Sequence, residues 1–147
     1  MFKSIVVGTD GSDTATQAVR QAVDLAVAIG ATLEIVSAYE PVPAQRLRQE
    51  RRETPEDLQW AINPREEVDV TLAAAGAVAA EAGLKANLYP RQGDPADAIL
   101  DVAEEREADL IIVGNKGMTG AKRFLLGSVP NKVSHHAPCS VLIMRTT

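Results

Sequence analysis

The sequence predicts an α/β fold in which five parallel strands form one sheet with helices on both faces. Three observations predict it. Short apolar runs alternate with helical patterns, 46% of the residues are apolar while only 3% are aromatic, and 147 residues suit one domain better than two. A core of Val, Ile, Leu and Ala suits a parallel sheet covered by Ala-rich helices. We therefore expect a single domain over residues 1–147.

The first strand and helix lie at the N-terminus. Residues 5–8 are an apolar run that ends in glycine, as expected of a buried strand. Three side chains in the turn that follows are able to cap a helix: Asp10, Ser12 and Asp13. The predicted helix at 14–29 has apolar side chains at helical spacing, namely Ala18, Ala22, Leu25, Ala26 and Ile29.

The second predicted strand, 33–39, is followed by a segment of different character. Residues 40–63 combine prolines with a group of arginines and have no strong periodicity. Connections this long are uncommon inside a compact domain and are often functional. We expect a partly helical flap here, and a solvated insertion without function remains the alternative.

The remaining elements follow the same alternation. Asn63 and Pro64 predict a helix start, and the buried stripe of that helix is expected to contain Val68, Leu72, Ala75, Ala79 and Ala82. A strand at 85–89 and a helix that starts at Asp94 come next. The last two predicted strands are 110–113 and 141–144.

A glycine-rich segment follows the fourth predicted strand. Gly114 and Gly117 are separated by two residues, and after nine more residues Gly127 and Ser128 open a short helix. Glycine permits close backbone approach to a ligand, and a helix N-terminus presents unpaired N–H groups with partial positive charge. This arrangement predicts a phosphate site that uses the Ser128 side chain and the N–H groups of Ser128 and Val129. Ser128 is also compatible with a role as an ordinary helix N-cap.

Three basic residues lie between these glycines: Lys116, Lys122 and Arg123. They either neutralise phosphate charge or belong to a solvated loop, and exposed basic side chains are most often simply solvated. We include Lys116 and Arg123 among the candidate nucleotide-binding residues. The sequence alone leaves both readings open.

The spacing Gly-x2-Gly-x9-Gly-Ser resembles the nucleotide-binding signature of the universal stress protein family. The resemblance extends over the chain, and the stretches at 5–12 and 137–144 both match. It implies a Rossmann-like, doubly wound sheet with strand order 3-2-1-4-5. It also implies that Asp10 lies near a bound nucleotide, that Thr9 makes a further contact, and that the backbone of Ala38 contacts adenine.

With that strand order, the winding of the sheet reverses between the first and fourth strands, where such folds bind ligands. The turns that begin at Gly8 and at Gly114 should then face each other across one crevice. Asp10 would stand at its edge, where a carboxylate accepts hydrogen bonds from a ligand or helps to hold Mg2+ beside phosphates. The alternative role for Asp10 is to cap the first helix.

We therefore expect a stress-response regulatory protein that binds ATP with Mg2+ and acts as a sensor or switch for an unknown protein partner. One alternative is a protein of the same family that binds cyclic AMP. Slow ATP hydrolysis is another, although no catalytic base is evident. A nucleotide-free interaction module is the last. The sequence contains no Gly-x4-Gly-Lys-Ser/Thr, Gly-x-Gly-x-x-Gly or Gly-x-Ser-x-Gly motif.

Charge, hydropathy and cysteine content limit the partners and the location that we expect for the protein. The formal net charge of −5 argues against a general nucleic-acid binder. No apolar stretch approaches the ~20 residues that span a bilayer, and no signal-peptide pattern begins the chain, so we expect a cytoplasmic protein without a membrane segment. Cys139 is the single cysteine, which excludes an internal disulfide and favours an inert, buried thiol.

The last predicted strand suggests how the chain associates. The stretch from Val141 to Met144 has apolar residues on both faces, and almost no chain follows to cover it. An unprotected sheet edge pairs readily with another chain, and a two-fold dimer satisfies it with one surface. The family resemblance implies the same arrangement. We expect a homodimer through this strand.

Overall fold

The protein is described by a computed structural model over residues 1–40, 64–115 and 126–146. Its strands form one all-parallel sheet in the order β3-β2-β1-β4-β5. They are β1 (Ser4–Gly8), β2 (Thr32–Tyr39), β3 (Asn87–Gln92), β4 (Leu110–Gly114) and β5 (Ser140–Met144). The predicted fold class and strand order are confirmed. The predictions for residues 41–63, the helix cap at Asn63 among them, fall outside the described residues.

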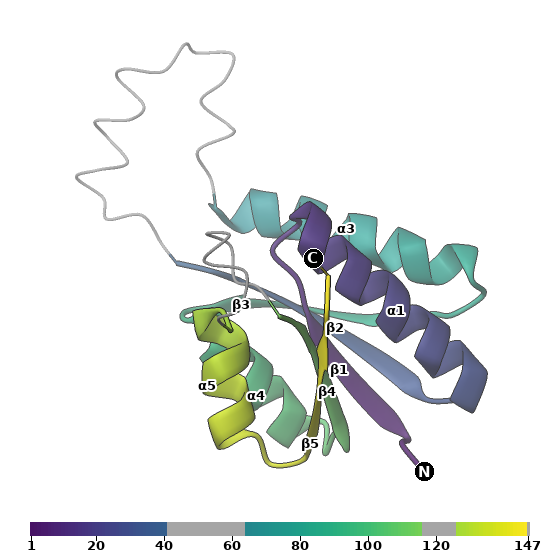
Figure 1. Cartoon of the computed structure of the whole chain (residues 1–147). Helices are drawn as coiled ribbons and strands as arrows, with labels where there is room; N and C mark the ends of the chain where they lie inside the picture. The colour runs from purple at the N-terminus through teal and green to yellow at the C-terminus, as the bar shows by residue number, and fades with distance from the viewer. Residues whose placement is uncertain (41–63, 116–125, 147) are drawn as a thin grey trace, which may run out of the picture.

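Two layers of helices enclose the sheet (Figure 1). Helices α1 (Asp13–Ile29) and α3 (Pro64–Glu81) cover one face, and α4 (Pro95–Glu105) and α5 (Ser128–His136) cover the other. Successive strand residues point to opposite faces, so Ile5 and Val7 pack toward the first pair of helices and Val6 toward the second. Within the described ranges, no helix is long and apolar enough to cross a membrane.

Strand β3 lies later in the chain than predicted. The expected strand at 85–89 stops before Pro90, whereas β3 continues through it to Gln92. β3 is an edge strand, and Gly93 N–H, just after it, donates to Tyr39 O of β2 (2.8 Å). Alternate residues of a strand face the same neighbour, so the backbone groups of Tyr89 and Arg91, on either side of Pro90, face β2 as well. The Pro90 nitrogen therefore faces the open edge, where the missing N–H costs no ladder hydrogen bond.

The predicted buried positions of the two helices are wrong only at the helix ends. Ala18, Ala22 and Ala26 of α1 are buried, as are the first four predicted residues of α3, but Ile29 is 42% exposed and Ala82 is exposed. Ile29 is the last residue of α1, and Ala82 lies just past the end of α3. Periodicity alone cannot tell where a helix passes beyond the core.

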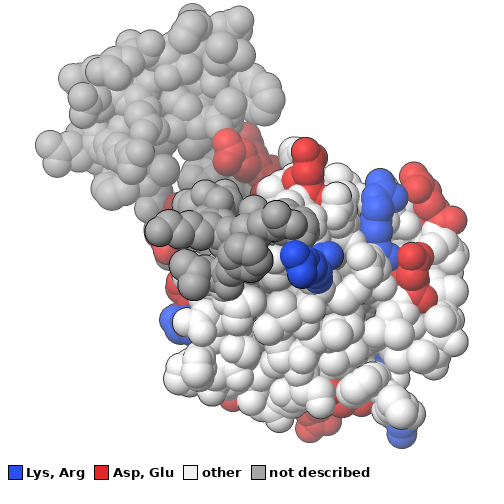
Figure 2. All heavy atoms as spheres, viewed as in Figure 1, with Lys and Arg blue, Asp and Glu red and all other residues white. Residues whose placement is uncertain are grey.

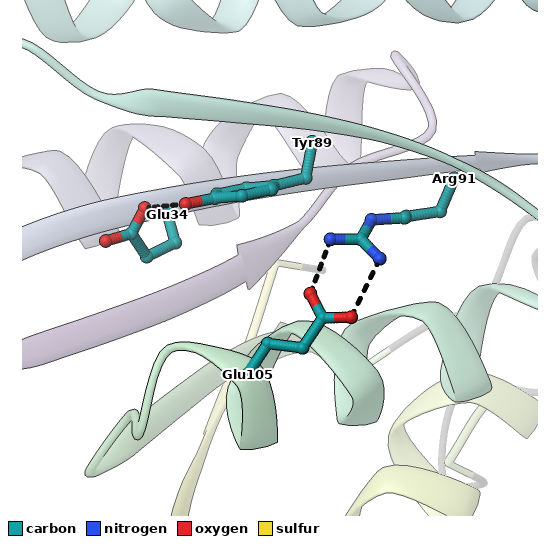
Figure 3. A network of polar contacts seen from close by, with 4 residues as sticks. All are labelled: Glu34, Tyr89, Arg91 and Glu105. Atoms are coloured by element: carbon teal, nitrogen blue, oxygen red, sulfur yellow. Dashed lines mark hydrogen bonds and ion pairs between the residues drawn. The ribbon is translucent and has the colours of Figure 1, made fainter.

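A polar network joins the β3 edge to the rest of the fold (Figure 3). Glu34 of β2 is only 2% exposed, and its Oε2 accepts a hydrogen bond from the Tyr89 hydroxyl (2.9 Å). Burial, and then this hydrogen bond, raise the pKa of Tyr89, which keeps the phenol protonated as a donor. Arg91 makes two hydrogen bonds to Glu105 of α4 (3.0 and 2.6 Å). The network fixes β3 against the helix whose start borders the cavity described next.

Candidate functional site

A cavity of about 340 Å³ lies at the carboxyl ends of the strands, where the strand order reverses. Its walls come from the end of β1 and the turn that follows it, the ends of β2 and β4, and the N-terminal parts of α1, α3, α4 and α5. Five of the predicted site residues line it together: Thr9, Asp10, Ala38, Gly114 and Val129. Gly8 lines it too, so the turns that begin at Gly8 and Gly114 meet at one cavity.

The other predicted site residues lie elsewhere. Lys116, Gly117 and Arg123 are outside the described residues. Gly127 and Ser128 are described and form the start of α5, but they do not line the cavity themselves. Their neighbour Val129 does, which brings the start of this helix to the cavity wall.

The turn after β1 is held by its own side chains. The N–H groups of Gly11 and Ser12 donate to Thr9 Oγ1 (3.1 Å) and Asp10 Oδ1 (2.9 Å). Ser12 is the N-cap of α1 and accepts a hydrogen bond from Ala15 N–H (3.2 Å). The alternative role of Asp10 as a helix cap is therefore wrong. Its Oδ2 has no partner among the described residues and stands at an exposed position on the cavity.

The end of β2 presents backbone groups to the cavity. β1 ends at the level of Val36, whose carbonyl accepts a hydrogen bond from Thr9 N–H (2.9 Å). Strand residues present N–H and C=O alternately to their two neighbours, and Tyr39 O, which bonds Gly93 N–H, faces β3. Ala38 therefore points its N–H and C=O toward the β1 side of β2. It lies two residues beyond Val36, the last residue of β2 that pairs with β1. No described residue bonds to its N–H or C=O there, and Ala38 lines the cavity.

The start of α5 presents a second set of backbone donors. Gly127 occupies the N-cap with φ −63° and ψ 167°, and Ser128 is the first helical residue, so the interpretation of Ser128 as the N-cap is wrong. Glycine has no side chain with which to cap the helix. The N–H groups of Ser128 and Val129 consequently have no acceptor among the described residues. They carry the partial positive charge of a helix N-terminus.

One wall of the cavity contains residues that are not among the predicted site residues. Tyr39 and Glu40 at the end of β2, and Glu67 and Thr71 of α3, all line the cavity. A signal existed for Thr71, because it is a polar residue three positions after the buried Val68, on the inward face of the helix. Glu67 has no such signal. The acidic residues gather on the α3 side, while α5 lies over the opposite face of the sheet.

Three carboxylates line the cavity, those of Asp10, Glu40 and Glu67. Among the described residues, no three His, Cys, Asp or Glu side chains stand close enough together to hold a metal ion. Mg2+ is usually held by one or two carboxylates together with substrate phosphates and water. The single carboxylate of Asp10 fits such a shared site and does not provide a site made of protein alone.

Cys139 lies outside the cavity, directly before β5. The residue is partly buried and packs against the apolar layer below α4 and α5. Burial, and to a lesser degree the nearby Asp109 carboxylate, raise the pKa of the Cys139 thiol. A raised pKa lowers the fraction of reactive thiolate at neutral pH, in keeping with an inert thiol.

The chain is similar to known proteins over almost its whole length. The model of the universal stress protein family matches residues 1–145. The Mycobacterium tuberculosis universal stress protein Rv1636 is 39% identical, with 99% of this chain and 98% of the relative covered.

Solved structures agree with this. A universal stress protein in complex with cAMP is 34% identical, with a TM-score of 0.73 and 99% and 98% of the two chains covered. The Archaeoglobus fulgidus universal stress protein in complex with dAMP is 25% identical, with a TM-score of 0.66 and 97% of each chain covered. By family model, identity and fold alike, this chain belongs to the universal stress protein family.

Proposed function

We propose that this protein binds ATP, assisted by Mg2+, in the cavity at the strand ends and acts as a nucleotide-dependent sensor or switch in a stress response. One observation carries the proposal. A single cavity is lined by Ala38, whose backbone N–H and C=O are open, and by Val129, which with the adjacent Ser128 has an N–H group without an acceptor among the described residues. The first pair suits a base and the second suits a phosphate.

The backbone of Ala38 would favour adenine over other bases. Its N–H donor is suited to N1 of adenine, which is an acceptor, and its C=O acceptor is suited to the 6-amino group. Guanine and hypoxanthine carry the opposite pattern, with a donor at N1 and an acceptor at position 6. A site that offers this fixed pair of groups leaves both unsatisfied with the wrong base.

The triphosphate would lie along the start of α5. The Ser128 and Val129 N–H groups and the Ser128 hydroxyl are its proposed ligands, and each charge-assisted hydrogen bond contributes about 1.5–3 kcal/mol. Lys116, Gly117 and Arg123 belong to the same proposed site. Asp10, whose Oδ2 is not engaged by described residues, would share Mg2+ with the phosphates.

Cyclic AMP is the second candidate ligand. A universal stress protein 34% identical to this chain has been solved in complex with cAMP, and a single phosphate requires fewer cationic contacts than a triphosphate. Titrations with ATP and cyclic AMP, each with and without Mg2+, separate the two. Mg2+ should strengthen ATP binding and leave cyclic AMP binding unchanged.

The phosphate site is tested by replacing Ser128 with proline. Proline is favoured at the first position of a helix, and the extended Gly127 before it (ψ 167°) is compatible with a following proline. The change removes one N–H donor and the hydroxyl while keeping the helix. Calorimetric titration should show ATP affinity reduced by about 10- to 100-fold.

The matched control is Ser128→Ala, which removes the hydroxyl and keeps the N–H. It should lose less ATP affinity than Ser128→Pro, and adenosine should bind all three proteins alike. Equal ATP affinity in wild type and Ser128→Pro would remove the start of α5 from the phosphate site. No binding of any adenine nucleotide by the wild type would reject the proposed function itself.

We also propose a homodimer through β5. This strand forms one edge of the sheet, and Leu142 on it is 38% exposed. β5 faces the viewer in Figure 1, and in the same view Figure 2 shows few charged residues over the middle of this face. Leu142→Arg should convert a dimer to a monomer in analytical ultracentrifugation. Leu88→Arg on the β3 edge, where Leu88 is 40% exposed, is the matched control and should leave the dimer intact. A monomeric wild type would contradict the proposal.

A further inference from the structure

Three separate parts of the chain meet at Asn115, the residue after β4. Its backbone N–H donates to Met144 O of β5 (2.9 Å), and its backbone C=O accepts from Gly127 N–H (3.1 Å). Its side-chain Oδ1 accepts from both the N–H (2.8 Å) and the hydroxyl (3.2 Å) of Thr146. The end of β4, the start of α5 and the chain after β5 are therefore bonded through one residue.

The bonds to Thr146 are more than a surface contact. Thr146 is a polar residue that is only 8% exposed, and buried polar groups in folded proteins almost always have hydrogen-bond partners. One oxygen atom of Asn115 accepts from both of its donors. Loss of that oxygen would leave the Thr146 N–H and hydroxyl without this acceptor, which favours local opening of the chain after β5.

The backbone of Asn115 acts on the other side, at α5. Gly127 is the N-cap of this helix, and its N–H donates to Asn115 O. The position of Gly127 sets where the next N–H groups, those of Ser128 and Val129, can reach. Asn115 does not line the cavity, so its bond to Gly127 would influence a bound phosphate without direct contact.

We propose that Asn115 is a positioning residue that couples phosphate binding at the start of α5 to the chain that follows β5, an inference that rests on the proposed nucleotide function. A phosphate held by the α5 N–H groups restrains Gly127, and Asn115 passes this restraint to Met144 and Thr146. The coupling is reciprocal, so an ordered chain end also favours the phosphate-binding geometry. Because β5 is an edge of the sheet, phosphate binding in the cavity changes the order of the chain at that edge.

The first test compares ligands with and without phosphate. Asn115→Ala removes the acceptor for both Thr146 donors, and Thr146→Val removes only the hydroxyl. Asn115→Ala should lower ATP affinity by about fivefold or more and change adenosine affinity by less than about twofold. Thr146→Val should act in the same direction by a smaller factor. Asn87→Ala, at an exposed asparagine at the start of β3, is the control and should bind both ligands as the wild type does.

The second test follows amide hydrogen exchange at Thr146. ATP should slow exchange of this amide in the wild type, adenosine should have little effect, and the ATP effect should be lost in Asn115→Ala. Equal losses for ATP and adenosine in both variants would mean a general structural role and would overturn the inference. So would wild-type behaviour of Thr146→Val and Asn115→Ala, provided that the wild type binds ATP. A wild type that binds neither ligand would reject the nucleotide function itself.

Discussion

The turn after β1 and the turn after β4 are built in different ways. In the turn after β1, Thr9 and Asp10 bond to N–H groups two residues further along. In the turn after β4, Asn115 bonds instead to Gly127 and to Thr146, which is 31 residues away in the sequence. The first turn is therefore a local structure, while the second depends on the assembled fold. A turn of the second kind is suited to report what happens elsewhere in the molecule.

Even the local turn has long-range constraints, and the tightest is at its first residue. A Cβ added to Gly8 would lie 2.5 Å from Ile99 Cδ1 and 3.0 Å from Ile99 Cγ1. Gly8→Ala should therefore lower the free energy of unfolding by about 1–3 kcal/mol through overpacking, as measured by urea denaturation.

The double variant Gly8→Ala/Ile99→Val checks this cause, because valine lacks the atom that approaches most closely. Ile99→Val alone should cost about 0.5–1.5 kcal/mol. The double variant should be more stable than the sum of the two single losses predicts. Strict additivity would show that Gly8 is required for a reason other than Ile99.

The last residue of the same turn gives a smaller effect. Gly11 has φ 83°, and an added Cβ would lie 3.0 Å from Thr71 Oγ1 on α3. Gly83 has a similar φ of 79° but no atom within 4 Å of an added Cβ. Both alanine variants should lose about 1 kcal/mol because of the left-handed backbone. Gly11→Ala should lose more in thermal unfolding, and equal losses would mean that Thr71 moves aside freely.

Asp10 should show the smallest effect on stability. Asp10→Asn keeps an oxygen that accepts from Ser12 N–H, so the free energy of unfolding should change by less than about 0.5 kcal/mol. The variant removes the carboxylate charge, and the gain in ATP affinity on adding Mg2+ should fall about tenfold. An unchanged Mg2+ effect in calorimetric titration would separate Asp10 from the metal.

The comparison of the turns also explains what could be predicted from sequence. Ser12 and Asp10 were candidates because capping and turn formation depend on neighbours in the chain. The strand order and the meeting of Gly8 and Gly114 followed from the resemblance and from the general rule for doubly wound sheets.

Other features could not be predicted because their partners are distant in sequence. No sequence pattern indicates the role of Asn115, since Thr146 and Gly127 become its neighbours only in the folded chain. The same holds for Glu67, which reaches the cavity because α3 packs beside the end of β2. The N-cap at Gly127 was missed because glycine and serine are both acceptable there, and only the backbone geometry distinguishes them.

In the proposed site, the Ala38 backbone recognises the base while the start of α5 holds the phosphates. Calorimetric titration of the wild type with ATP and with ITP tests it most directly, since the two ligands share ribose and triphosphate and differ in the groups at N1 and position 6. We expect ATP to bind at least about tenfold more tightly than ITP. Equal affinities would contradict it, because the base would then not be read by the backbone of β2.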